Sequence, residues 1–159
     1  MARIYDLEDR LIDYTCRMID VTESLPKTRS GKYMAGQLIK SCHSPAFNYS
    51  ESQAAESPDD FIHKLKVVLK ELKECRTSLK IIIKKGFISP KAKKEPIYKE
   101  TEELIAIIGK CISTAEKNKK ALQNNLKGSM NMAATYSPAF WCSTIGHGGL
   151  NFSVRYGKR

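Results

Sequence analysis

The sequence has no apolar run long enough to span a membrane. Its longest apolar run, Leu104–Ile108, is far shorter than the roughly 20 residues of a transmembrane helix. The N-terminus carries Asp6, Glu8 and Asp9 where a signal peptide would be apolar. The five cysteines show no paired spacing, and those in helical patterns are typical of small hydrophobes in a reducing compartment. We therefore expect a cytoplasmic protein without a membrane segment.

The residue combinations of common enzymes and metal sites are missing as well. His43, His63 and His147 are far apart in the sequence, and no Glu-x-x-His pair of the di-iron type occurs. Gly146–Gly149 lacks the lysine and the following helix of a phosphate loop. Ser44 has no catalytic context. We expect no enzyme activity, no metal and no cofactor.

Acidic residues are scarce relative to basic ones. The chain of 159 residues has 27 Lys and Arg against 17 Asp and Glu, which gives a formal net charge of +10 and a pI of about 9.4. Such a balance favours an acidic partner, first of all nucleic acid, although solubility alone is the simpler explanation. The strongest asymmetry lies between Phe61 and Lys94, where eleven basic residues face two acids, Glu71 and Glu74.

One long amphipathic helix is predicted between Ser57 and Gly86. Ser57 is a good N-cap, and Gly86 is a natural stop. Apolar residues recur between them at spacings of three and four, which places them on one stripe of the helix. The lysines fall largely outside this stripe. The positively charged residues of this region are the predicted nucleic-acid contacts: Lys64, Lys66, Lys70, Lys73, Arg76, Lys80, Lys84, Lys85, Lys91, Lys93 and Lys94.

Three further helices are expected over residues 4–25, 30–55 and 97–120. Helix 30–55 contains Pro45, which predicts a kink, and we expect Asn48 and Glu51 to have structural roles at a helix junction. The apolar positions assigned to this helix include Tyr33, Ile39 and Phe47. The fold class is therefore all-α, an antiparallel up-down-up-down four-helix bundle over residues 1–122. Residues 123–159 form an irregular tail or carry a short strand.

Some apolar residues lie off the core stripes. Tyr5, Ile12 and Ile19 recur seven apart on the first helix, and a helix with two apolar stripes usually has two neighbours. A broad core face in a monomer is the alternative. Val67 and Ile81 point away from the core stripe of helix 57–86. We predict that these five residues contact another subunit.

Several short stretches of the sequence form an ordered set: Leu25-Pro26-Lys27, Gln37-Leu38, Ser44-Pro45-Ala46-x-Asn48-x-x-Glu51, Leu69–Arg76, Gly86–Ser89, Glu103–Ile107 and Thr114–Asn118. Each stretch is weak alone, and their order makes the set specific. In this set the chain resembles the four-helix-bundle proteins encoded in intervening sequences of bacterial 23S rRNA genes. The resemblance covers about residues 5–120, and Ser52 departs from it where the family often has glycine.

The resemblance implies a small, non-enzymatic bundle that assembles as a ring-like homopentamer. A related branch is the accessory variability determinant of diversity-generating retroelements, a basic pentamer that binds nucleic acid and a reverse transcriptase. We therefore expect an oligomeric RNA- or DNA-binding protein. The most specific form of this expectation is the accessory subunit of a retroelement reverse transcriptase. The alternative is a structural or protein-interaction bundle encoded by an rRNA intervening sequence, without nucleic-acid binding.

Overall fold

The computed structural model describes residues 6–88 and 94–128, with side chains described for 6–88 and 96–124. These residues form four helices and no strand: α1 (Leu7–Glu23), α2 (Arg29–Gln53), α3 (Pro58–Lys84) and α4 (Lys94–Gly128). The all-α prediction is therefore confirmed. None of the described helices is both long and apolar enough to cross a membrane.

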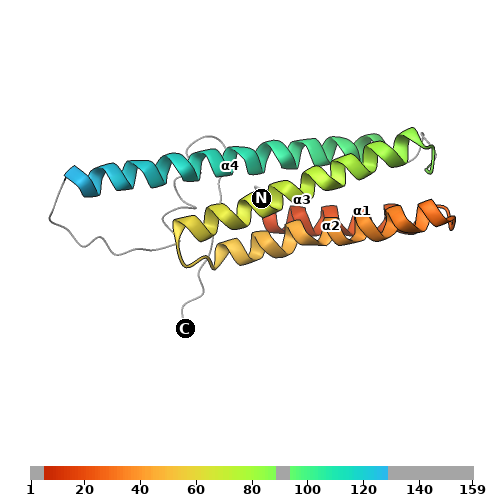
Figure 1. Cartoon of the computed structure of the whole chain (residues 1–159), viewed down its shortest axis with the longest axis horizontal. Coiled ribbons are helices and arrows are strands. Elements are labelled where there is room, and N and C mark those ends of the chain that lie inside the picture. The colour runs from red at the N-terminus through yellow and green to blue at the C-terminus, as the bar shows by residue number, and fades with distance from the viewer. Residues whose placement is uncertain (1–5, 89–93, 129–159) are drawn as a thin grey trace, which may run out of the picture.

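The four helices pack around one core along the long axis of the molecule (Figure 1). α1 packs against α2 and α4, and α3 packs against the same two helices, so α1 and α3 occupy diagonal corners. Ion pairs join Asp59 to Lys119 and Arg76 to Glu102, so α3 and α4 run in opposite directions. The core stripe of α3 is buried as its spacing predicts, from Phe61 to Ile82.

The signals at the ends of α3 act as the sequence indicates. The Ser57 hydroxyl accepts a hydrogen bond from the Asp60 backbone N–H at 3.1 Å. Gly86 has a φ of +66°, which favours glycine, and the backbone N–H groups of Gly86 and Phe87 donate to the carbonyls of Ile83 and Ile82. This pair of bonds is a Schellman motif, and it ends the helix by satisfying two carbonyls of its last turn.

α4 is longer at both ends than the predicted 97–120. It begins at Lys94, because Pro96 falls in the first turn, where a missing N–H costs no helical hydrogen bond. It continues through Asn124 and Asn125 to Gly128, past the boundary predicted at residue 122. Its C-terminal end extends beyond the start of α3 (Figure 1). The remaining part of the predicted tail, 129–159, lies outside the described residues.

α2 runs unbroken through Pro45, which is buried against its neighbours. The Thr15 hydroxyl of α1 lies 2.9 Å from the Cys42 carbonyl, one turn before the proline. The Asn48 side-chain amide donates to the Ser44 carbonyl at 2.9 Å. Polar side chains therefore bond two backbone carbonyls in the turn before Pro45, where an internal proline disturbs the helical hydrogen bonds.

Candidate nucleic-acid and partner-binding surfaces

Lysines form an exposed stripe along α3, outside the stripe of its buried residues. Lys66, Lys73, Lys80 and Lys84 are separated by seven, seven and four residues, so they project from one face of the helix. All four are exposed. Together they place positive charge along roughly 27 Å of helix, at about 1.5 Å per residue. We call these four residues the lysine stripe.

Ion pairs within the molecule occupy half of the α3-region cations whose side chains are described. Lys64 pairs with Glu51 of α2 at 2.5 Å, and Lys66 pairs with Glu116 of α4 at 2.7 Å. The hydrogen bond to Glu51 raises the pKa of Lys64, and the bond from Lys66 lowers the pKa of Glu116. The other pairs are Lys70 with Glu71 and Glu74, and Arg76 with Glu102. Lys64, Lys66 and Arg76 therefore join α3 to α2 or α4, whereas Lys70 pairs within α3.

The cations that remain lie toward the C-terminal half of α3. Among the described residues, Lys73, Lys80, Lys84 and Lys85 have no carboxylate within ion-pair distance. The Lys80 ammonium lies 6.0 Å from the centre of the Tyr98 ring of α4, at the outer limit of a cation–π contact. Of the other predicted contacts, Lys91 and Lys93 lie outside the described residues, and Lys94 begins α4.

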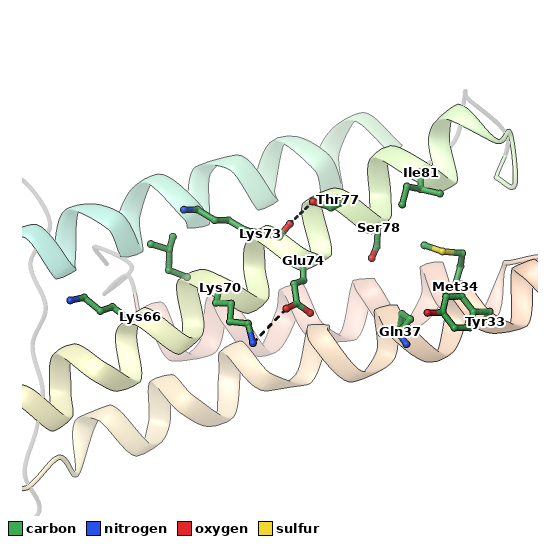
Figure 2. Close-up of a pocket in the computed structure, with 11 residues that line it drawn as sticks. Tyr33, Met34, Gln37, Lys66, Lys70, Lys73, Glu74, Thr77, Ser78 and Ile81 are labelled. Carbon is green, nitrogen blue, oxygen red and sulfur yellow. Dashed lines mark hydrogen bonds and ion pairs between the residues drawn. The ribbon is translucent and has the colours of Figure 1, made fainter.

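A surface groove of about 600 Å³ runs between α2 and α3. Figure 2 shows that Tyr33, Met34 and Ile81 gather toward one end of it and lysines toward the other. Lys70 reaches Glu74 across one helical turn, at 3.7 Å. The other residues that line the groove are Gln37, Lys66, Leu69, Lys73, Thr77 and Ser78. The groove thus joins an apolar end to a mainly basic end.

Two of the predicted subunit contacts are large apolar side chains in solvent. Ile12 of α1 is 46% exposed, and Ile81 of α3 is 43% exposed. Ile19 and Val67 are half-buried, and Tyr5 lies outside the described residues. Ile81 lines the groove on the α2 side of α3, whereas Lys80 points toward Tyr98 of α4. Ile81 and Lys80 therefore face different neighbours of α3, although Lys66 and Lys73 of the lysine stripe also line the groove.

The outer face of α2 carries aromatic residues that the sequence pattern assigned to its apolar positions. Tyr33 is 66% exposed and Phe47 is 64% exposed, whereas Ile39 is 40% exposed. The His43 ring stacks on Phe47, with centroids 6.4 Å apart and planes 20° apart. Tyr33, Lys40 and Phe47 are spaced by sevens, and this spacing is the signal that places them together on one face.

The residues assigned a structural role lie around the junction of α2 and α3. Glu51 is exposed and pairs with Lys64 of α3, while Asn48 bonds within its own helix. Pro45 is buried. Asn48 bonds to Ser44 and Glu51 to Lys64, so the geometry here is that of helix packing.

Reactive chemistry finds little support in the described residues. The Cys42 sulfur lies 3.6 Å from Nδ1 of His43, but burial raises the pKa of the Cys42 thiol to about 11, whereas a catalytic thiolate needs a lowered pKa. Burial likewise raises the pKa of Cys75 to about 12. Among residues 6–88 and 94–128, no three His, Cys, Asp or Glu side chains are grouped to hold a metal ion.

Comparisons with known proteins agree with this architecture. A solved protein of unknown function from the S23 ribosomal protein family of Bacteroides thetaiotaomicron is 25% identical, with a TM-score of 0.62, over 67% of this chain and 98% of that one. No curated protein matches the chain. The sequence profile of the 23S rRNA-intervening sequence proteins matches residues 6–110, two thirds of the length. The chain belongs to the 23S rRNA-intervening sequence protein family.

Proposed function

We propose that this protein is a non-catalytic, oligomeric nucleic-acid-binding protein that contacts phosphates through the lysine stripe of α3. The observation that supports this is the position of Lys73, Lys80 and Lys84, which share one exposed face and have no carboxylate partner among the described residues. Lysines held this way neutralise phosphates and carry little sequence information. Binding therefore depends on charge and tolerates many sequences.

Assembly multiplies this surface. The resemblance of the chain supports a ring-like homopentamer, and exposed Ile12 and Ile81 support contacts between copies. A ring repeats the lysine stripe at regular intervals and lengthens the contact with a phosphate backbone. In its sharpest form the proposal is an accessory subunit that holds RNA or cDNA against the reverse transcriptase of a diversity-generating retroelement, which rests on the resemblance alone.

A second candidate is a protein-interaction bundle without nucleic-acid binding. The ion pairs within the molecule favour this second function. They account for half of the described α3-region cations without a binding partner outside the chain, namely Lys64, Lys66, Lys70 and Arg76. In that case the exposed apolar residues are the functional surface, and the lysines keep the protein soluble.

A salt titration of binding to a structured RNA distinguishes the nucleic-acid-binding function from the protein-interaction function. The oligomer mass is measured on the same sample. The test variant is Lys73→Glu/Lys80→Glu/Lys84→Glu. The matched control is Lys99→Glu/Lys110→Glu/Lys117→Glu, which changes the charge equally at exposed positions of α4. We expect the test variant to lose binding and the control to retain most of it, with a slope of log K against log salt that reflects the phosphates neutralised. Equal losses in both variants, or no binding by the unmodified protein at low salt, would overturn the proposal.

A further inference from the structure

The outer face of α2 combines exposed rings with unopposed positive charge. Over residues 29–50 the sequence has Arg29, Lys32 and Lys40 and no Asp or Glu. All three cations are exposed. Lys40 lies halfway between Tyr33 and Phe47, about 10 Å along the helix axis from each. No other described helix presents two aromatic side chains that are about two-thirds exposed.

These two rings lie outside the core of the bundle, because about two thirds of each side chain is in solvent. Phe47 is stacked with His43, which makes a broader flat surface at one end of the face. At the other end Tyr33 borders the α2–α3 groove, where Lys70 and Lys73 also lie (Figure 2). Gly36, between the rings in sequence, has open space around it, so the surface there is unobstructed.

We infer that the outer face of α2 binds single-stranded nucleic acid, with bases stacked on Tyr33 and Phe47 and phosphates drawn to Lys40 and the groove lysines. This inference rests on the proposed function and specifies its substrate class. Aromatic platforms beside basic side chains are the arrangement that single-strand binders use, and closed duplexes do not offer the faces of internal bases to such platforms. The two rings are about 21 Å apart along the axis, which is about six nucleotides at 3.4 Å each.

The excess of positive charge on α2 favours this occupant over another protein, although Glu74 of the neighbouring groove is exposed and pairs with Lys70. A docking helix of ordinary composition would bring lysines as well as acids, whereas a nucleic-acid strand brings one negative charge per nucleotide. Glu71 of α3 lies close enough to Lys40 to feel its charge, but it is largely buried and leaves the exposed face basic.

The experiment measures anisotropy of fluorescein-labelled 12-nucleotide poly-dT, 12-nucleotide poly-U and a 12-base-pair DNA duplex at several salt concentrations. The variants are Tyr33→Ala and Phe47→Ala, with Tyr33→Phe and Phe47→Tyr as rescues and Ile39→Ala of α2 as an exposed apolar control. We expect each alanine variant to weaken single-strand binding about tenfold and the rescues to restore it. The salt slope stays unchanged in the alanine variants and falls by about 1 in Lys40→Gln.

A second readout locates the bases directly. Poly-dT carrying 5-bromouracil, irradiated on the full-length protein, should form cross-links to peptides that contain Tyr33 or Phe47. This inference would be overturned if single strands and duplex bind with equal affinity and if the alanine variants bind as tightly as the unmodified protein. The lysine stripe would then remain the proposed site. No binding of any probe would overturn both. Loss of oligomer mass in Tyr33→Ala or Phe47→Ala would show that the rings contact another copy, and would also overturn the inference.

Discussion

At the scale of single residues, a buried pair of hydroxyls joins α1 to α4. The Tyr14 hydroxyl lies 3.0 Å from the Thr101 hydroxyl, which itself donates to the Ile97 carbonyl at 2.7 Å. Thr101→Val removes the acceptor and leaves the buried Tyr14 hydroxyl with only the weaker sulfur of Cys75 nearby. Tyr14→Phe leaves Thr101 bonded to Ile97. We expect Thr101→Val to cost about 2 kcal/mol and Tyr14→Phe about 1 kcal/mol in urea unfolding. The reverse order would contradict this geometry.

The buried thiols give the protein a predictable response to alkaline pH. Burial raises the pKa of Cys42 to about 11 and that of Cys75 to about 12, from ordinary values near 9. Below pH 9 both thiols are protonated in the folded and unfolded chains, so their contribution is constant. Above pH 9 the unfolded chain loses these protons first, so stability falls as pH rises toward 11 or 12. Thermal unfolding from pH 8 to 10.5 should show this decline, with a shallower slope in Cys42→Ala/Cys75→Ala. If the double variant shows the same slope of stability against pH, groups other than these two thiols cause the decline.

At the scale of helices, two glycines of α2 should respond in opposite directions to the same change. A Cβ on Gly31 would lie 1.9 Å from the Pro26 carbonyl oxygen, a backbone atom of the tight α1–α2 connection. A Cβ on Gly36 meets nothing within 4 Å. Gly36→Ala should therefore stabilise the helix by about 0.5–1 kcal/mol, and Gly31→Ala should destabilise the protein by more than that. Chemical unfolding of the two variants makes the comparison, and stabilisation by Gly31→Ala would refute the close approach.

Helix existence was predictable because each helix carries its own signals. The cap at Ser57, the stop at Gly86 and the spacing of the α3 core residues are all local. The ends of α4 were missed because local signals there compete: Pro96 and Asn124 look like breakers, yet a first-turn proline is tolerated and single asparagines cost little in a helix. Tyr33 and Phe47 were assigned to apolar positions because they are aromatic. The residue type alone does not tell whether that face of the helix packs against another helix or faces solvent.

At the scale of the whole molecule, the sequence predicted which residues form the basic surface of α3. It did not predict which of them are ion-paired within the molecule. The sequence places the lysines on one side of α3, and the structure agrees for Lys66, Lys73, Lys80 and Lys84. The ion pairs from Lys64 to Glu51 and from Lys66 to Glu116 join residues 13 and 50 positions apart, so they depend on helix packing. The aromatic face of α2 emerges for the same reason, once α1 and α3 are seen to leave it uncovered.

Charge and exposure together predict how copies of the chain meet. α1 has five acids and two bases, whereas α3 has seven bases and four acids, so the net charges are −3 and +3. These helices occupy diagonal corners of the bundle, and each exposes an isoleucine, Ile12 or Ile81. We therefore expect α1 of one copy to contact α3 of the next, a head-to-tail contact of the type that can close into a ring.

A head-to-tail contact has a consequence that a two-fold symmetric contact lacks. Ile12→Glu and Ile81→Glu each spoil one of the two complementary surfaces, so each variant alone should be monomeric. Mixed in equal amounts, they should form dimers and no larger species, because the intact Ile81 surface of the first meets the intact Ile12 surface of the second. Mass measured by light scattering tests this, with Ile39→Glu on α2 as an exposed apolar control. If the unmodified protein is monomeric, or if the mixture stays monomeric, the α1–α3 contact is wrong and the apolar residues serve a different partner.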